Sequence, residues 1–273
     1  MSELTAKIEA ARDYINQFWK EKPVAGIILG SGLGNLAEEI EDSISIPYSD
    51  IPHFPESTVE GHSGKLILGF MEDRPVVAMA GRFHYYEGFT MQQVTFPVRV
   101  MKALGIETLL ISNAAGGMNP DFEVGDLMII RDHINLQPEH PLRGKNDDKL
   151  GPRFPDMSEP YNKDLILTAF NIAAANNIDV HSGVYVGVQG PTFETRAEYR
   201  YMHIIGGDAV GMSTVPEVIV AVHSGLKVFA MSVITDIGIR EEENVITHEE
   251  VLAAAKDAEP KLTFIFSELI RQL

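Results

Sequence analysis

The sequence predicts an α/β fold, in which helices flank both faces of a central, mixed but largely parallel β-sheet. Eight short apolar runs rich in β-branched residues have the length of strands. Segments with helical spacing lie between several of them, and strands that alternate with helices form a sheet covered on both faces. The 273 residues are 45% hydrophobic and show no repeat or linker-like change in composition. We therefore expect residues 1–273 to form one domain.

Each element is expected from the local pattern, in chain order. The strands are expected at residues 24–29, 65–70, 75–80, 107–111, 127–130, 183–188, 208–211 and 227–233. The helices are expected at residues 91–104, 165–176, 196–205, 217–224 and 249–272, after a polar, helix-prone segment at 1–20. Pro260 should kink or interrupt the last helix because it lacks a backbone N–H. Residues 137–161 contain five prolines, which predicts an irregular excursion that serves as a lid or a subunit contact.

The composition excludes several classes of function. Without cysteine the chain can have no disulfide framework, thiolate nucleophile or Cys-ligated zinc. The formal net charge of −17 argues against a nucleic-acid surface and against an anionic membrane as partner. No stretch approaches 18 uninterrupted apolar residues, and residues 1–20 lack the apolar core of a signal peptide. We expect a soluble, cytoplasmic protein.

Two glycine-rich stretches follow predicted parallel strands. Residues 30–34 read GSGLG and residues 114–117 read AAGG. Glycine lets the main chain approach a ligand closely, so two such loops at one edge of a sheet can direct backbone N–H groups at one anion. The first stretch has neither the G-x-G-x-x-G spacing of dinucleotide sites nor the Lys-Ser/Thr ending of a P-loop. A phosphate site and an ordinary strand-to-helix turn remain the alternatives.

Three threonines begin predicted helices in the pattern of a capping box, each with a glutamate three residues later. They are Thr195, Thr214 and Thr247. Ser213 precedes the second helix, where the positive end of the helix favours an anion. His248 occupies the first position of the third helix, where an imidazolium is disfavoured, so this side chain is expected to be neutral.

Arg82 and His84 follow the predicted strand at residues 75–80 and lie on one side of an extended segment. Such a pair can bind an oxyanion, because arginine offers a forked set of donors and histidine adds one N–H. The alternative is a surface arginine beside a histidine paired with Glu87. No histidine pair has the spacing of a zinc motif and no G-x-S-x-G elbow occurs, so we expect neither a metal nor a Ser-His-Asp hydrolase.

Taken together, the motifs resemble the trimeric, low-molecular-mass purine nucleoside phosphorylases. In order between about residues 24 and 265, they are GSGLG at 30–34, GHSG at 61–64, GRFHxYEG at 81–88, NAAGG at 113–117, GPTFET at 190–195, GMSTVPE at 211–217 and HEEVL at 248–252. The resemblance implies a nucleoside phosphorylase-like fold and reversible cleavage of purine (deoxy)ribonucleosides by phosphate. The products are the free base and α-(deoxy)ribose 1-phosphate. It also implies a homotrimer that needs no cofactor, with inorganic phosphate as co-substrate.

The same resemblance implies roles for individual residues. The phosphate would be bound by Ser31, His62 on a mobile loop, Arg82, His84, the Ala114 backbone N–H and Ser213. The ribose would contact Tyr86, the Met212 backbone and His248. The base would contact Ala115, Gly116, Phe193, Glu194, Thr235 and Asp236. Catalysis would rest on His84, Glu194 and Asp236, and Phe154 would reach the site of a neighbouring subunit.

Asp236 departs from the pattern of this family, which commonly has an asparagine that donates to purine N7. An ionised aspartate cannot donate and would repel the charge that develops on the leaving base. Asp236 could be protonated and act as a general acid, or it could favour a 6-aminopurine, as in the related methylthioadenosine phosphorylases. Glu194 suits the protonated N1 of a 6-oxopurine, and His248 suits a free 5′-hydroxyl. We therefore expect inosine and guanosine, with methylthioadenosine phosphorolysis or a non-catalytic nucleoside sensor as alternatives.

Overall fold

The computed structural model describes residues 2–56, 64–239 and 247–273. Within them, nine strands form one mixed sheet in the order β2-β3-β4-β1-β5-β8-β7-β6-β9, with a further pairing of β5 to β9. The bounds are β1 (Ala25–Ile28), β2 (Glu41–Pro47), β3 (Lys65–Met71), β4 (Arg74–Ala80), β5 (Thr108–Gly117), β6 (Leu127–Asn135), β7 (His181–Gly187), β8 (Ala209–Gly211) and β9 (Lys227–Ile237).

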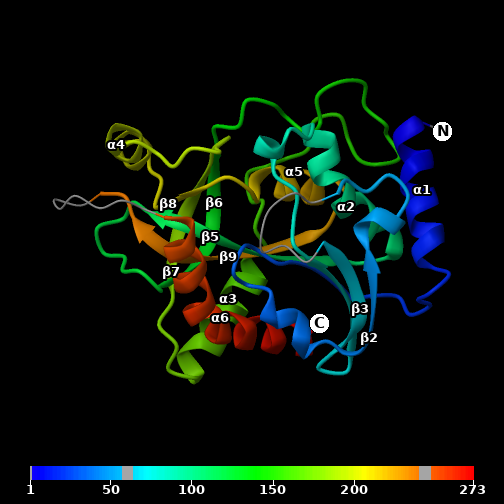
Figure 1. Cartoon of the computed structure of the whole chain (residues 1–273), viewed down its shortest axis with the longest axis horizontal. Coiled ribbons are helices and arrows are strands. Elements are labelled where there is room, and N and C mark those ends of the chain that lie inside the picture. Colours follow the sequence, from blue (N-terminus) through cyan, green and yellow to red (C-terminus); the bar gives the residue numbers. More distant parts are fainter. Residues whose placement is uncertain (1, 57–63, 240–246) are drawn as a thin grey trace.

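The sheet closes on itself at one end. Because β5 pairs with both β8 and β9, the five strands β5, β8, β7, β6 and β9 form a closed ring, and β1, β4, β3 and β2 extend from it (Figure 1). Strands β4, β1, β5 and β9 are neighbours that run parallel. Their carboxyl ends therefore meet at one edge, where ligands of α/β sheets usually bind.

Helices cover both faces of this sheet. Their bounds are α1 (Glu3–Ile15), α2 (Met91–Leu104), α3 (Lys163–Ala175), α4 (Arg196–Ile204), α5 (Val215–His223) and α6 (His248–Arg271), with short 3₁₀ turns η1 (Asn35–Glu39), η2 (Tyr48–Asp50) and η3 (Tyr85–Glu87). One apolar core includes residues of α1, α2 and α5, and a second includes residues of α3 and α6. Figure 1 shows α2 and α5 above the strands and α3 and α6 below them. The predicted α/β class, with helices on both faces, is confirmed.

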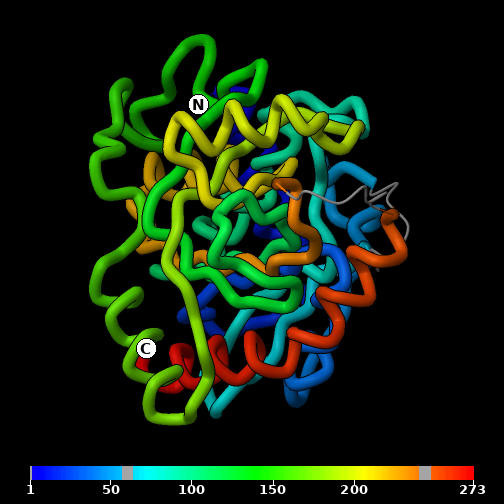
Figure 2. The backbone as a smooth tube through the Cα atoms, turned by 90° about the vertical axis from the view of Figure 1, so that its left-hand side faces the viewer, coloured from blue at the N-terminus to red at the C-terminus, as the bar shows by residue number. Residues whose placement is uncertain are grey.

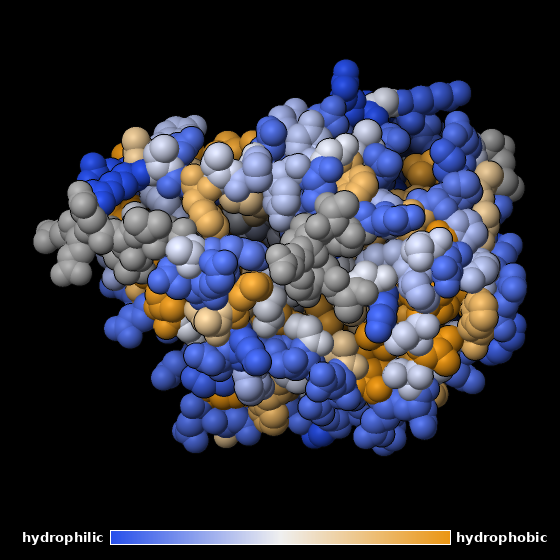
Figure 3. Space-filling view, viewed as in Figure 1, coloured by the Kyte–Doolittle hydropathy of each residue, from blue (hydrophilic) through white to orange (hydrophobic). Residues whose placement is uncertain are grey.

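The surface differs from these cores in character. Hydrophilic side chains dominate the face seen in Figure 3, with apolar groups scattered between them. Among the described residues no helix is long and apolar enough to span a bilayer. Residues 137–161 contain neither helix nor strand, as predicted, and Figure 2 shows this green excursion projecting at the upper left of the molecule.

The structure corrects three predictions about individual elements. The second glycine-rich stretch is not a loop, because β5 continues to Gly117 and pairs there with β8 and β9. Glycine serves close packing here: a Cβ atom on Gly116 would lie 2.9 Å from the Tyr199 hydroxyl. Strand β2 was not expected, since this edge strand is mostly exposed and polar. Helix α6 continues through Pro260, so the predicted interruption is wrong, while the kink stays a prediction. Because proline has no N–H, the Lys256 carbonyl lacks its usual helical donor. Both Lys256 and Pro260 are exposed, so water can hydrogen-bond to that carbonyl.

Candidate active site

A pocket opens at the edge where β4, β1, β5 and β9 end. It is lined by Ser31, Arg82, His84, Tyr86, Asn113, Ala114, Ala115, Gly116, Phe193, Glu194, Tyr199, Val210, Gly211, Met212, Ser213, Thr235, Asp236, His248 and Val251. All but two of the site residues predicted from the sequence are therefore brought together. His62 lies outside the described residues. Phe154 lies on the excursion, 86% exposed, so its contact with a neighbouring subunit stays a prediction.

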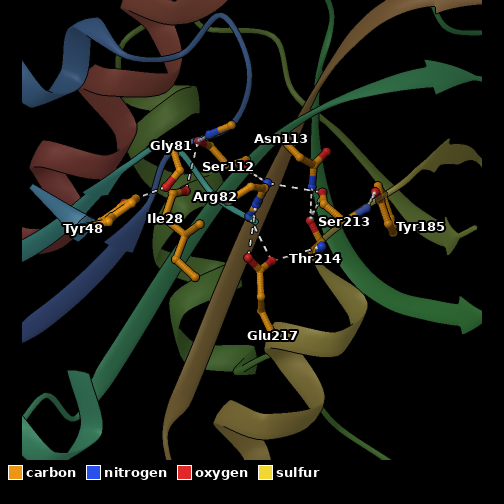
Figure 4. A network of polar contacts seen from close by, with 11 residues as sticks. Ile28, Tyr48, Gly81, Arg82, Ser112, Asn113, Tyr185, Ser213, Thr214 and Glu217 are labelled. Atoms are coloured by element: carbon orange, nitrogen blue, oxygen red, sulfur yellow. Dashed lines mark hydrogen bonds and ion pairs between the residues drawn. The ribbon is translucent and has the colours of Figure 1, made fainter. Parts of the chain in front are cut away.

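Arg82 forms the centre of the first group of polar contacts (Figure 4). Its side chain is only 1% exposed, so the surface-arginine alternative is wrong. Its Nε and Nη2 atoms donate to the two carboxylate oxygens of Glu217, at 3.2 and 3.0 Å. Nη1 donates to the Ser112 carbonyl at 2.8 Å and to the Ser213 hydroxyl at 3.2 Å. The forked geometry fixes the guanidinium, and the buried charge is compensated by its partner.

Glu217 also holds a strained turn beside Ser213. Thr214 has φ 69° and ψ −57°, and the Val215 N–H donates to the Ser213 carbonyl at 2.7 Å. These are the features of a γ-turn, which is rare for a residue with a β-branched side chain. The Glu217 carboxylate accepts from the Thr214 N–H at 3.0 Å, and the Thr214 hydroxyl accepts from Asn113 at 2.9 Å. Backbone strain of this kind persists where surrounding contacts over-determine it.

His84 lies beside this group and is held by its own turn. Its Nδ1 lies 3.0 Å from a carboxylate oxygen of Glu87, and its ring stacks on Tyr86 with a centroid distance of 4.7 Å. The predicted pairing with Glu87 is thus present, but the histidine is buried and lines the pocket. A carboxylate on Nδ1 fixes the tautomer and makes Nε2 the ring atom that can contact a ligand.

The first glycine-rich stretch is a turn, as expected, and carries Ser31 to the pocket. Gly32 has φ +74°, and a Cβ atom there would lie 2.8 Å from the side chain of Ala255 on α6. After the turn, the N–H groups of Asn35 and Leu36 donate to one carboxylate oxygen of Glu259, at 2.6 and 3.2 Å. Burial raises the pKa of Glu259. Sequence reasoning missed this glutamate, because a lone acidic residue inside a long helix resembles a solvent-facing one.

A β-bulge shapes the other end of the pocket. In the pairing of β5 with β9, Ala115 lies opposite Ile234, but Gly116 lies opposite Asp236, so Thr235 is the extra residue. In a regular strand, neighbouring side chains point to opposite faces. The bulge breaks this alternation, and Thr235 and Asp236 both line the pocket.

The same end of the pocket is acidic. Burial raises the pKa of Glu194, and the charge of Asp236 adds to this effect, while a hydrogen bond from Tyr199 opposes it. The Tyr199 hydroxyl donates to Asp236 at 3.0 Å, and burial raises the pKa of this phenol. Sequence reasoning did not identify Tyr199, because its spacing within α4 indicates only a core position.

The helix starts agree with the expected capping. Thr195 and Thr247 both act as N-caps with reciprocal bonds to a glutamate. Helix α6, which Thr247 caps, begins at His248, and His248 lines the pocket. Among the described residues no group of three or more His, Asp or Glu side chains could hold a metal ion.

Strand β5 runs between the two polar groups. Its residue Ser112 accepts from Arg82, and its residue Gly116 lies opposite Asp236. Four residues of extended strand span roughly 13 Å. The pocket can therefore hold an oxyanion at one end and a planar heterocycle with N–H donors at the other.

The chain is similar to known proteins along nearly its whole length. Residues 24–271 match the family model described as the phosphorylase superfamily. Purine nucleoside phosphorylase 1 of Bacillus subtilis strain 168 is 50% identical over 266 residues, which cover 97% of this chain and 98% of that protein. Purine nucleoside phosphorylase 1 of Geobacillus stearothermophilus is 52% identical, with 97% of each chain covered. The crystal structure of isoform 2 of purine nucleoside phosphorylase from Schistosoma mansoni, in complex with cytosine and ribose-1-phosphate, matches with a TM-score of 0.94 at 46% identity, covering 98% of this chain and 96% of that one.

Proposed function

Because this chain belongs to the phosphorylase superfamily, we propose that it is a purine nucleoside phosphorylase. It cleaves purine (deoxy)ribonucleosides with inorganic phosphate and releases the free base and α-(deoxy)ribose 1-phosphate, in a reversible reaction. The observation that carries this proposal is the pocket itself, which joins a buried arginine–serine–histidine group to an acidic, aromatic-lined end. The names of the full-length relatives support the same activity.

The phosphate is bound at the arginine end. Ser31, Ser213 and the Ala114 backbone N–H donate to its oxygens, and Nε2 of His84, whose Nδ1–H faces Glu87, accepts from the hydroxyl of hydrogen phosphate. Arg82 is bound to Glu217 and Ser213, so it both orients Ser213 and supplies positive potential. His62, outside the described residues, would complete the group from the loop implied by the family resemblance.

The nucleoside lies between the two ends. Tyr86, the Met212 backbone and His248 contact the ribose, and Phe193 packs on the base beside Ala115 and Gly116. When the purine departs from C1′, positive charge develops on the sugar and negative charge on the base. The phosphate lies beside the sugar, and the acidic end contacts the base through hydrogen bonds. Positioning one bound nucleophile against C1′ lowers the barrier by several kcal/mol, or roughly 7–11 in the best cases, and needs no covalent intermediate.

Glu194 favours 6-oxopurines, because an ionised carboxylate accepts from the protonated N1 of hypoxanthine or guanine. Inosine and guanosine are thus the expected substrates, and the polar His248 suits a free 5′-hydroxyl. The homotrimer, the contribution of Phe154 to a neighbouring site and the cytoplasmic location remain predictions from the sequence.

The direct test is to incubate the protein with inosine, with and without inorganic phosphate, and to measure hypoxanthine and ribose 1-phosphate. We expect phosphate-dependent release of both products. Equal release of hypoxanthine in both samples would indicate a hydrolase, and binding without cleavage would indicate a sensor.

A further inference from the structure

Tyr199 lies at the base end of the pocket, between two acidic side chains. Its hydroxyl donates to Oδ2 of Asp236 at 3.0 Å, and Glu194 lies close enough to the phenol that its charge raises the pKa of Tyr199, after the effects of burial and of Asp236. Oδ1 of Asp236 accepts from the Thr235 hydroxyl at 3.2 Å. A phenol carries one proton but can both donate and accept. It can therefore bridge two carboxylates only by donating to one of them at a time.

The tyrosine ring is held firmly in this position. Its side chain is 2% exposed. A Cβ atom on Gly238 would lie 2.2–2.3 Å from three of its ring carbons, and one on Gly116 would lie 2.9 Å from its hydroxyl. Two glycines, one in β5 and one directly after β9, thus make room for the ring. The bridge is built into the fold.

The surroundings make two ionised carboxylates costly here. Asp236 is 6% exposed, and burial raises the pKa of Glu194, with the charges of Asp236 and Glu198 adding to the effect. Among the described lining residues, the other titratable groups are Arg82, His84, Tyr86 and His248. Arg82 lies at the far end, where it is paired with Glu217. Like charges at one desolvated site favour uptake of a single shared proton.

We infer that Tyr199 joins Glu194 and Asp236 into one proton-sharing unit, and that this unit lets the pocket accept 6-aminopurines as well as 6-oxopurines. The inference rests on the proposed function and extends it to a second substrate class. Tyr199 is a positioning residue in this scheme, because it acts through the two carboxyl groups.

The two substrate classes require opposite placements of the one proton. A 6-oxopurine presents an N1–H donor and acceptors at O6 and N7, which match an ionised Glu194 and a protonated Asp236. A 6-aminopurine presents an N1 acceptor and an N6–H donor, which match a protonated Glu194 and an ionised Asp236. The Tyr199 hydroxyl turns toward whichever carboxylate is ionised. The total number of bound protons is the same in both complexes.

The proton balance of the reaction is closed for inosine. The C1′–N9 bond breaks with its electron pair on the base, and a C1′–O bond to phosphate forms. The base takes a proton at N7 from the Asp236 carboxyl group. Hydrogen phosphate loses one proton as it becomes the sugar phosphate dianion, and that proton restores Asp236 by way of solvent. With adenosine the shared proton stays on Glu194, and the proton that hydrogen phosphate loses reaches the departing adenine by way of solvent.

The test compares kcat/KM for inosine and adenosine between about pH 5 and 9. The variants are Tyr199→Phe, Asp236→Asn and, as a matched control on the same helix, Tyr201→Phe at an exposed tyrosine. For the wild type we expect a bell-shaped dependence of kcat/KM on pH, with an acid limb and an alkaline limb that are the same for both substrates. Both substrates need the pair of carboxyl groups to carry one proton. Tyr199→Phe should move both limbs to higher pH with both substrates, since each carboxylate loses a donor to its ionised form. Tyr201→Phe should leave them in place.

Asp236→Asn separates the two substrates. Asparagine can still donate to N7, so inosine cleavage should persist and lose its alkaline limb. Without the charge of Asp236, Glu194 stays ionised and repels adenine N1, so adenosine cleavage should fall by about a hundredfold, a loss of about 2.7 kcal/mol. If Tyr199→Phe lowered activity by one factor at every pH, and by the same factor in the Asp236→Asn background, its role would be structural and the inference wrong.

A binding measurement keeps the inference testable apart from catalysis. Calorimetry in buffers of different ionisation enthalpy should show that hypoxanthine and adenine both bind without net proton uptake between the two limbs. Proton uptake with adenine alone would overturn the shared proton. If the wild type did not cleave inosine in a phosphate-dependent way, only the proposed function would be overturned, because the binding measurement does not depend on catalysis. Cleavage of inosine without that of adenosine would overturn only this inference.

Discussion

The two ends of the pocket solve the problem of buried charge in different ways. At the phosphate end, Arg82 is matched by the carboxylate of Glu217 in a forked pair that is almost fully buried. At the base end, Asp236 accepts from the Tyr199 hydroxyl, and burial, with the charge of Asp236 in addition, raises the pKa of Glu194. The first end is complete before a ligand arrives. The second end is completed by the hydrogen-bond donors of its ligand.

Under the proposed function, this difference explains how a chain with a net charge of −17 can hold a phosphate. The overall charge acts at long range and is screened by salt. Binding depends on donors within a few ångströms of the anion, and those at the phosphate end are oriented by contacts such as the Arg82 bond to Ser213. The acidic side chains inside the pocket gather at the opposite end of β5.

The largest effect is expected from breaking the phosphate end. Arg82→Met removes the guanidinium and leaves Glu217 buried without its partner, which typically costs about 3–5 kcal/mol. We expect that loss in the free energy of unfolding, and a fall in phosphorolysis of at least about a thousandfold, because electrostatic stabilisation and phosphate orientation are lost together. Urea unfolding and inosine turnover measure the two effects.

A second substitution separates the two losses. Glu217→Gln in the Arg82→Met background removes the unpaired charge, so stability should largely return while activity stays low. Recovery of activity together with stability would show that Arg82 supports the fold alone. It would then remove Arg82 from the phosphate site.

The next effect is expected at the base end. Glu194→Ala leaves the N1–H of a bound 6-oxopurine without an acceptor, and sites built around such a hydrogen bond lose about 10²-fold or more when it is missing. We expect kcat/KM for guanosine to fall by that factor while the melting temperature changes little. Glu198→Ala is the control, because this neighbouring glutamate serves the helix cap. Near-native guanosine turnover would exclude Glu194 from base binding.

More of the phosphate end than of the base end could be predicted from the sequence. Its residues lie in short local motifs at strand ends, and the positive φ at Gly32 follows from the need for a tight turn. The fold class followed from strands that alternate with helices. The continuation of β5 to Gly117 did not, since glycine more often ends a strand than packs beneath a tyrosine.

The base end depends on contacts between segments far apart in the sequence. Tyr199 and Asp236 form a hydrogen bond although they lie 37 positions apart in the sequence, and the bulge at Thr235 allows Thr235 and Asp236 both to line the pocket. A bulge has no reliable local signal. Glu259 was missed for a similar reason, because its backbone partners at Asn35 and Leu36 lie 224 and 223 positions away.

A smaller effect concerns stability and pH at the base end. The pKa of Glu194 is raised, chiefly by burial, so the folded protein binds a proton here more readily than the unfolded chain. Its ionisation therefore opposes folding above the raised pKa, and this cost disappears as the pH falls to the ordinary range of glutamate. Glu194→Gln should stabilise the free protein at neutral pH, by less than about 1 kcal/mol because water still reaches the group. Urea unfolding of both proteins should converge in acid, and a gap that widens there would contradict this account.

The smallest effect is expected from a substitution near the phosphate end, which tests how rigidly the turn at Ser31 is held. Glu259 accepts from two N–H groups just beyond the turn that carries Ser31, so it ties the turn to helix α6. Glu259→Gln keeps an accepting oxygen but loses the charge, which weakens these bonds by a fraction of their usual value of about 1.5–3 kcal/mol. We expect KM for phosphate to rise about two- to threefold while KM for inosine is unchanged, and Asp257→Asn on the exposed side of the same helix to alter neither. An equal rise in both constants would mean that Glu259 supports helix α6 as a whole, because the pocket residue His248 begins that helix and would shift together with the turn.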